Sequence, residues 1–389
     1  LCSLYCFLRG SASETRKRAW YDGAVVSCLL GMGTKGVMLT APAMILAYDY
    51  VFLSGASLGT VRLRWKVHAA LFVTAGAALC LALLYREYGI ASYVDPERVT
   101  RYLLTQFRVV ACYLKLAAWP HPLCLDYGWK TVSGLKEVAA PAALILVLVG
   151  AAIVSLWRRQ VPGYLGTWFF AILAPTSSLF PIYDVMVEHR LYLSLVGPIV
   201  LAVVLAYHGI EWYGGAGARK RQWGVAASVL LIVCFAILTM LRNRDYRSEK
   251  TLWNDVVRKQ PDNLRARNDL AVAFCEEGRF EVAQEHFDYV LDKTAGASRG
   301  HEATPGGIPY ALANNSAQFN RCRAFANMGV MESVRGRNDK AVSNFVESLR
   351  VYPYSDDIQL KLRQSLLRQG VAPRDVESVT KQLLQGKKD

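Results

Sequence analysis

A series of long apolar runs between residues 20 and 241 most constrains how this chain can fold. A helix needs about 20 predominantly apolar residues to cross a bilayer, and it satisfies its backbone polar groups internally, where no water is available. From residue 242 onward the chain is polar and helix-prone. The sequence therefore predicts an all-α protein, with a polytopic transmembrane helix bundle over residues 1–241 and a polar helical domain over residues 242–389.

The basic residues predict how the apolar runs are oriented. The formal net charge of +14 could indicate nucleic acid, but much of it lies in short clusters between the apolar runs. Cytoplasmic loops of membrane proteins carry such an excess of lysine and arginine. We therefore predict membrane lipid and no nucleic acid as partners, and we place the clusters at residues 16–18, 62–66, 158–159 and 219–221 in the cytoplasm. Counting the passes puts the C-terminal domain outside the cytoplasm.

Individual passes follow from the lengths of the runs. The run over residues 20–53 would form a helix about 51 Å long, against a hydrocarbon core of roughly 30 Å. Residues 33–36 interrupt it, so we predict a hairpin of two short helices with Lys35 at the outer turn. Residues 102–119 contain Gln106, Arg108 and Lys115, which favours an interfacial or re-entrant helix at the outer face. Single passes are expected at residues 66–85, 139–157, 163–181, 191–210 and 224–241.

The stretch over residues 175–197 places three ionisable side chains, Glu188, His189 and Arg190, between two apolar runs. A charge at the bilayer centre costs roughly 2.5–3.5 kcal/mol, so these side chains must lie at a membrane surface or in a polar cavity. We predict that they belong to a functional site on the outer face. The alternative interpretation is a solvated loop with a local Glu–Arg pair.

Nine cysteines are scattered along the chain, several of them inside apolar runs. They form no Cys-x-x-Cys motif and no other paired spacing of metal ligands. We interpret them as small buried apolar residues, and the sequence leaves the presence of a metal unknown.

The polar domain contains a repeated pattern of small and large residues, with the spacing of tetratricopeptide repeats of about 34 residues. Small residues let two antiparallel helices approach closely, and large ones fill the gaps. We predict a tetratricopeptide-repeat α-solenoid, with an exposed insertion at residues 295–318 and a degenerate repeat or cap after residue 356. Glu332 departs from the pattern, because its position is normally apolar. The matching residues are Leu270, Ala271, Phe274, Gly278, Phe280, Ala283 and Phe287, then Phe325, Met328, Gly329, Gly336, Ala341, Phe345 and Pro353.

Repeats of this kind offer a surface for an extended chain. We therefore predict a protein or peptide acceptor at the repeat surface. Because a fold alone does not establish a function, the alternative is a structural spacer or a dimer-forming array.

Three membrane motifs precede the repeats: GMGTKGVMLTAPAMILAYDYVFL, YLLTQFRVVACYLKLAAWPHPLCLDYGW and LAPTSSLFPIYDVMVEHRLYLSLVG. In this order they resemble bacterial relatives of the transmembrane-and-TPR O-mannosyltransferases, which belong to the C-type glycosyltransferase superfamily. The resemblance implies a polyprenyl-phosphate sugar as donor substrate at the outer face, with no certain cofactor. It also implies a bacterial inner membrane with the repeats in the periplasm, and an endoplasmic reticulum membrane is the alternative.

The resemblance also indicates candidate residues for binding substrate and lipid phosphate. Lys35 matches the Lys of the family's Lys-Glu turn, where Gly36 replaces the Glu. We expect Arg190 and Lys35 to bind the donor phosphate, since both side chains recognise phosphate oxygens, and we expect Glu188 or Tyr192 to orient Arg190. For Lys35 the alternative is snorkelling from a helix end. The full candidate set is Lys35, Asp126, Tyr127, Glu188, His189, Arg190 and Tyr192, while Ser194 replaces a family Pro and Gly197 is retained.

The family's catalytic acidic residue lies in a first outer loop, which would precede Leu1. The resemblance therefore leads us to interpret the chain as an N-terminally truncated fragment that is inactive alone, with a parent that transfers a hexose. A general base is needed to take the proton of the acceptor hydroxyl, and we assign none here. The alternative function is a non-catalytic membrane-anchored scaffold whose repeats recruit periplasmic proteins. A polysaccharide polymerase or ligase is a third hypothesis, and the short connection at residues 182–191 argues against it.

Overall fold

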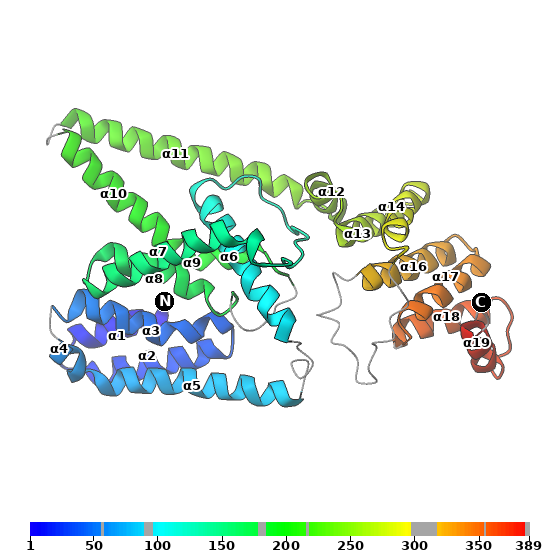
Figure 1. The fold of residues 1–389 in the computed structure, drawn as a ribbon, viewed down its shortest axis with the longest axis horizontal. Coiled ribbons are helices and arrows are strands. Elements are labelled where there is room, and N and C mark those ends of the chain that lie inside the picture. Colours follow the sequence, from blue (N-terminus) through cyan, green and yellow to red (C-terminus); the bar gives the residue numbers. More distant parts are fainter. Residues whose placement is uncertain are drawn as a thin grey trace. The chain divides into compact units, whose positions relative to one another are not determined.

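The computed structural model describes residues 1–55, 58–88, 96–177, 184–214, 218–296, 317–353 and 355–385. Within these ranges every regular element is helical (Figure 1), which confirms the all-α prediction. The chain divides into two compact units. The first contains Leu1–Leu123 and Thr131–Leu230, and the second contains Cys124–Lys130 and Leu231–Asp389.

Helices α1, α2, α3 and α5 of the first unit share an apolar core that includes Phe7, Cys28, Ile45 and Leu71. The predicted break in the run over residues 20–53 is confirmed, because α2 ends at Met32 and helical structure resumes at Gly36. Lys35 lies in the turn between them. The elements are α1 (Cys2–Ala12), α2 (Lys17–Met32), η1 (Gly36–Thr40), α3 (Ala41–Tyr48), η2 (Asp49–Leu53), α4 (Leu58–Leu63) and α5 (Trp65–Tyr88).

Helix α6 is amphipathic and packs against α7. Its buried side chains form a stripe of helical periodicity that includes Tyr102, Thr105, Val109 and Tyr113. It is not among the helices that are apolar enough to span a membrane, in keeping with its three polar interruptions. The elements are α6 (Pro96–Ala118), η4 (Leu135–Glu137), α7 (Ala139–Trp157), α8 (Val161–Leu173), η5 (Glu188–Arg190), α9 (Leu191–Ser194), α10 (Val196–Gly214) and α11 (Ala218–Asp245).

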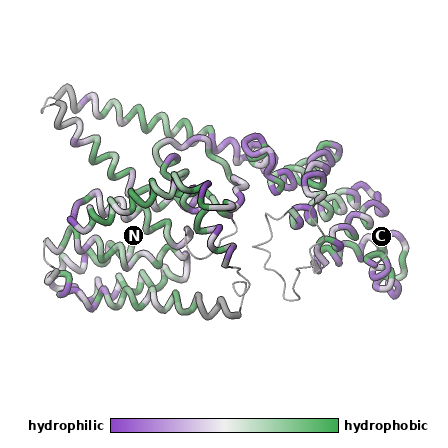
Figure 2. The backbone as a smooth tube through the Cα atoms, viewed as in Figure 1, coloured by the Kyte–Doolittle hydropathy of each residue, from purple (hydrophilic) through white to green (hydrophobic). Residues whose placement is uncertain are grey.

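Three helical segments among the described residues are long and apolar enough to cross a membrane: Gly36–Leu53, Ala139–Trp157 and Gln222–Asp245. Glu188–Ser194 and Val196–Gly209 together form a fourth candidate, bent by 52°. Figure 2 shows hydrophobic residues along these helices and more hydrophilic ones from α12 onward. The structure is therefore compatible with integration in a membrane.

The pass predicted at residues 163–181 differs from its expected form. Helix α8 contains only 13 residues, about 20 Å of helix against a core of roughly 30 Å. It ends at Leu173, shortly before Pro175. Proline has no backbone N–H and cannot continue the hydrogen-bond pattern of the helix, which is the local reason for the early end.

The second unit is a series of antiparallel helix pairs joined by short turns. Gly278, Gly336 and Gly370 lie in these turns with φ of 73°, 76° and 91°, a conformation that glycine adopts without steric cost. The predicted packing residues Ala271, Phe287, Ala341 and Phe345 are buried. The helices are α12 (Glu249–Lys259), α13 (Leu264–Glu276), α14 (Phe280–Lys293), α16 (Ala317–Val334), α17 (Asn338–Val351), α18 (Asp356–Arg368) and α19 (Val376–Gln385).

Gly329 occupies a place that the repeat pattern reserves for a small residue. A Cβ atom there would lie 2.6 Å from the Phe345 ring. Helices α16 and α17 can therefore approach closely because residue 329 has no side chain. The predicted insertion at residues 295–318 falls mostly outside the described residues, which stop at residue 296 and resume at residue 317.

Candidate functional site

Two tyrosines of α6 hold both flanks of the charged stretch in the first unit. The Tyr102 hydroxyl donates to the carbonyl oxygen of Thr176 at 2.7 Å. The Tyr113 hydroxyl donates to the carbonyl oxygen of Val187 at 2.7 Å and accepts from the Val187 N–H at 3.2 Å. Their separation is close to three helical turns, so both lie on one face of α6. Sequence reasoning missed these tyrosines, and their helical spacing on the buried stripe was the available signal.

Arg190 folds back over the backbone of its own loop. Its guanidinium group donates to the carbonyl oxygens of Val185, at 3.2 Å, and Asp184. These bonds use two of the five guanidinium N–H donors. The carbonyl groups of its own loop therefore hold the Arg190 guanidinium group, and the expected role of Glu188 or Tyr192 in orienting it stays a prediction. The Tyr192 side chain is 83% exposed.

The structure brings Lys35 close to the charged stretch, although the two are far apart in sequence. The His189 ring lies within range of electrostatic interaction with Lys35, Arg190 and Asp184. Lys35 itself is exposed, with an extended backbone at the start of η1. Lys35 and Arg190 therefore place two cations near the His189 ring, and we call these three residues the cationic cluster. Their roles in binding remain predictions.

Helix α6 also contributes polar groups near this cluster. Arg108, Lys115 and Glu188 all lie within range of electrostatic interaction with Cys112. Glu188 and Asp184 are therefore the acidic members of a predominantly basic neighbourhood. A net positive charge of this kind favours an anionic ligand.

The end of the charged motif packs helices together. A Cβ atom at Gly197 would lie 2.3 Å from the carbonyl oxygen of Leu165 on α8. Ser194 is buried and donates to the carbonyl oxygen of Leu191 at 2.9 Å. The Trp168 indole N–H of α8 donates to the carbonyl oxygen of Leu193 at 2.9 Å. These contacts hold the one-turn helix α9 and the start of α10 against α8.

An apolar cavity of about 580 Å³ lies between α6, α7 and α8. It is lined mainly by aliphatic and aromatic side chains, among them Phe107 and Phe170. Gln106 is only 4% exposed, and neither atom of its side-chain amide has a hydrogen-bond partner. The hydroxyl groups of Thr167 and Ser177 also lack partners. The cavity thus combines a large apolar surface with a few unpaired polar groups, as ligand pockets commonly do.

Asp126 and Tyr127 belong to the second unit. The Asp126 carboxylate accepts from the Gly128 N–H at 2.8 Å. The backbone carbonyl oxygen of Asp126 accepts from the Asn263 side-chain amide at 3.3 Å. Asn263 also caps α13 by accepting from the Ala266 N–H at 3.0 Å. Tyr127 is buried. These contacts fasten the segment Cys124–Lys130 to α13.

A buried ionic group in the first unit was missed from the sequence. Asp49, fully buried in the π-helical turn η2, accepts from Arg64 Nε at 2.9 Å and from the Ser54 hydroxyl at 2.8 Å. His68 Nε2 lies 2.8 Å from the same carboxylate. Arg64 therefore neutralises Asp49, although the orientation argument counted it as a loop charge. A single Asp within the apolar run over residues 41–53 was the signal.

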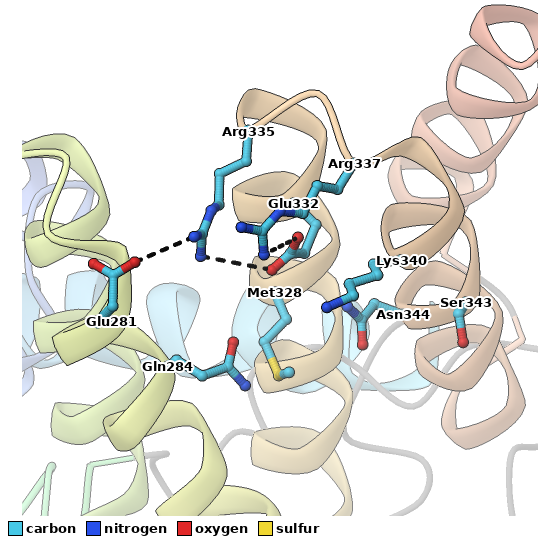
Figure 3. Close-up of a pocket in the computed structure, with 9 residues that line it drawn as sticks. All are labelled: Glu281, Gln284, Met328, Glu332, Arg335, Arg337, Lys340, Ser343 and Asn344. Atoms are coloured by element: carbon cyan, nitrogen blue, oxygen red, sulfur yellow. Dashed lines mark hydrogen bonds and ion pairs between the residues drawn. The ribbon is translucent and has the colours of Figure 1, made fainter.

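Glu332 lines a polar pocket of about 520 Å³ between α14, α16 and α17 (Figure 3). It is only 5% exposed, with carboxylate oxygens 3.9 Å from Arg335 and 3.6 Å from Arg337. Arg335 also pairs with Glu281 at 3.2 Å. The departure from the repeat pattern at Glu332 therefore has a physical reason, because two arginines compensate a buried carboxylate.

Among the described residues, no group of three or more histidine, cysteine, aspartate or glutamate side chains could hold a metal ion. The fold and site together define an all-helical protein that joins apolar helices of membrane-spanning character to a unit of polar helix pairs. The first unit carries a cationic cluster and an apolar cavity, both of which involve α6.

The chain has distant homologues among protein O-mannosyl-transferases. It is 29% identical over 225 residues to Tmtc3 of Drosophila melanogaster, which covers 54% of the chain and 23% of that relative. Mouse TMTC1 is 24% identical over 213 residues, which covers 51% of the chain and 22% of that relative. Mouse TMTC4 is 25% identical over 211 residues, which covers 51% of the chain and 27% of that relative. The chain thus spans less than a third of the length of these curated relatives. No family model and no solved structure matches it.

Proposed function

We propose that this protein takes part in transferring a hexose from a polyprenyl phosphate to a hydroxyl group of a protein acceptor. The observation that carries the proposal is the cationic cluster of Lys35, His189 and Arg190. A lysine ammonium group and an arginine guanidinium group suit the oxygens of a lipid phosphate. The names of the distant homologues support the same reaction class.

The apolar cavity supports a lipid-linked donor. An isoprenoid chain is a hydrocarbon, and burying it in an apolar cavity is favourable by about 25 cal/mol per Å² of surface. Helix α6 contributes Gln106 and Phe107 to the cavity, while its residues Arg108 and Lys115 lie near Glu188. We propose that α6 positions the donor by contributing to both parts. Proton abstraction from the acceptor requires a general base, and we assign that role to no residue of the described ranges.

The donor proposal is tested by lipid binding to the chain in nanodiscs. The probes are undecaprenyl phosphate and undecaprenol, which differ only in the phosphate. Lys35→Met should weaken binding of the phosphate about tenfold, since a hydrogen bond to a charged group contributes about 1.5–3 kcal/mol, and should leave undecaprenol unaffected. Lys136→Met, at another exposed lysine, is the matched control. Equal binding of the two lipids, or equal effects of the two variants, would contradict the proposal.

We further propose that the helix pairs form a tetratricopeptide solenoid, and that its polar pocket binds the acceptor as an extended, acidic peptide. Lys340, Ser343 and Asn344 lie on one face of α17 and line the pocket (Figure 3). Hydroxyl and amide side chains can bond both N–H and C=O groups of a peptide backbone. The pocket contains three cations and two carboxylates, which favours an acidic segment.

Peptide binding to the full chain tests the acceptor proposal. Fluorescent peptides that differ only by Glu or Lys at alternate positions are titrated against the wild type and Lys340→Gln. The acidic peptide should bind more tightly, and the variant should lose several-fold in affinity for it. Lys361→Gln, in α18 outside the pocket, is the control. A preference for the basic peptide would overturn the proposal.

A membrane-anchored scaffold is the second candidate function, and Gly36 favours it. Gly36 stands where the resembling family has Glu, and a Cβ atom there would meet no neighbour within 4 Å. Lys35 therefore has no acidic partner at the next residue. Peptide binding without any preference for undecaprenyl phosphate would support the scaffold and contradict the transferase.

We also propose that the second unit lies outside the cytoplasm, in the periplasm of a bacterium with this protein in its inner membrane. The basic clusters at residues 16–18, where α2 begins, and at residues 219–221, in the first turn of α11, support this orientation by the positive-inside rule. Alkaline phosphatase fused after residue 385 should be active, whereas a green fluorescent protein fused there should be dark. The opposite pattern would reverse the orientation.

A further inference from the structure

A second basic site lies at the other end of α2 from Lys35. A pocket of about 570 Å³ opens between the first turns of α2 and α5, lined by Lys17 and Arg18 from one helix and Lys66 from the other. Helix α2 contains 16 residues, so it separates this pocket from Lys35 by about 24 Å of helix. The pocket is therefore distinct from the proposed donor site.

The two helices deliver positive charge to the pocket in two ways. Both begin there, α2 at Lys17 and α5 at Trp65, and each helix N-terminus carries a partial positive charge of about half an elementary charge. Lys17, Arg18 and Lys66 add three full charges, against the single carboxylate of Asp22. Among the described residues, none of these four side chains has an ion-pair partner. The pocket therefore has an excess of positive charge that is not neutralised within the protein.

Tyr21 forms part of the pocket wall. Its hydroxyl group is buried within the protein, and the residue lies within range of electrostatic interaction with Arg64 and Asp49. The basic side chains of the pocket are therefore the groups that a ligand can reach.

The surroundings of the pocket are those of a lipid molecule rather than of a free anion. Val25 and Ala70 line its apolar side, and further along the same helices Leu30 and Val73 are 68% and 69% exposed. Trp65, at the start of α5, is 60% exposed, and tryptophan is enriched at the level of lipid headgroups. The charged end and the exposed apolar flank follow each other along the helices, as headgroup and acyl chains do in a phospholipid.

We propose that this pocket binds the headgroup of one anionic phospholipid. Lys17, Arg18 and Lys66 contact the phosphate, and the acyl chains lie along the exposed apolar side chains of α2 and α5. Basic pockets between membrane helices bind anionic headgroups in this way. The site would fix the depth of these helices in one leaflet, and it does not rest on the proposed transferase function.

Native mass spectrometry of the chain in nanodiscs of phosphatidylcholine and phosphatidylglycerol tests the proposal. The wild type should retain one phosphatidylglycerol molecule. The double variant Arg18→Gln/Lys66→Gln should lower its affinity about thirtyfold, at about fivefold for each basic residue removed. Asp22→Asn should raise the affinity, a gain that misfolding cannot produce.

Two controls make the outcome decisive. Lys136→Gln removes one exposed lysine outside the pocket and should leave retention unchanged. Inorganic phosphate at millimolar concentration should not displace the lipid, because it lacks the apolar contacts. The proposal would be overturned if both lipids were retained equally, or if Lys136→Gln had the same effect as the double variant. It would also be overturned if Asp22→Asn bound the lipid more weakly, or if phosphate displaced the lipid.

Discussion

Asp49 shows what a single charged residue does inside an apolar unit. Its carboxylate has no exposed surface and binds Arg64, His68 and Ser54. Ser54 directly follows η2, Arg64 lies between α4 and α5, and His68 lies in the first turn of α5. A buried ion pair is weak evidence for stability as a whole, but removing one partner leaves an uncompensated buried charge. Asp49 is therefore a position where one substitution should have a large effect.

Asp49→Asn should destabilise the first unit by about 3–5 kcal/mol, because it leaves Arg64 buried without a counter-charge. The measurement is unfolding of the chain in mixed micelles by titration with sodium dodecyl sulfate, followed by circular dichroism. Glu97→Gln breaks the exposed pair with Arg101, whose side chains are 66% and 49% exposed, and should change stability by less than about 1 kcal/mol. Equal stability of the two variants would show that the Asp49 network is unimportant.

His286 makes the second unit sensitive to pH. Burial, and next the charge of Arg267, lowers the pKa of His286. The unfolded side chain titrates near pH 6.5. Between that value and the lower folded-state pKa the unfolded chain binds more protons, so stability is complete above about pH 6.5 and falls as the pH decreases through this window.

His286→Phe should reduce this loss, since Phe does not titrate and can keep the stacking on Phe274, where the ring centroids are 5.7 Å apart. Urea unfolding of the second unit at pH 7.5 and pH 5.5 measures the effect. The exposed His121, replaced by Gln, is the control. If the wild type and His286→Phe lose the same stability between the two pH values, the assignment is wrong.

At the scale of elements, glycines set the distance between α8 and its neighbours. A Cβ atom at Gly163 would lie 2.1 Å from the Leu156 backbone nitrogen of α7, and one at Gly197 would lie 2.3 Å from Leu165 on the opposite side of α8. Small residues allow membrane helices to approach closely. The retained Gly197 of the charged motif therefore has a packing role, and it holds the start of α10 in place after the Glu188–Arg190 turn.

Gly197→Ala should destabilise the packing of α8 against α10 by about 1–3 kcal/mol through overpacking. Gly209 lies in the same helix, and a Cβ atom there would meet no other atom within 4 Å, so Gly209→Ala should be neutral or stabilising by up to about 1 kcal/mol. Thermal unfolding in detergent compares the two. A Gly197→Ala variant as stable as Gly209→Ala would rule out the close contact.

At the scale of the whole molecule, the chain crosses between its two units more than once. Residues Cys124–Lys130 leave the first unit, pack in the second, and the chain then returns at Thr131. Asp126 forms the turn of this segment, and Asn263 joins it to α13. The contacts support a structural role for Asp126 beside the binding role expected from the family resemblance.

Asp126→Asn should keep binding of undecaprenyl phosphate and most of the stability, because an amide oxygen can still accept from the Gly128 N–H and only the ion pair with Arg265, at 3.7 Å, is lost. Asp126→Ala loses that bond and should cost about 1 kcal/mol, with faster proteolysis at Lys130. The comparison separates the two roles. Loss of lipid binding in Asp126→Asn, with the fold intact, would show that the carboxylate charge acts in the site.

Local features of the sequence were enough to predict the helical class, the break before Gly36 and the residues that pack the helix pairs. Hydropathy, helix-breaking residues and glycine conformations act within a few residues, so a linear pattern can reveal them. The tertiary structure decided three other features: the proximity of Lys35 to His189, the pairing of Asp49 with Arg64, and the carbonyl contacts of Arg190. Charged side chains find their partners through space, and the distance along the chain does not say which partner is near. The same reason explains why a buried Glu332 and the shared pocket of Arg18 and Lys66 became visible only when the helices were packed.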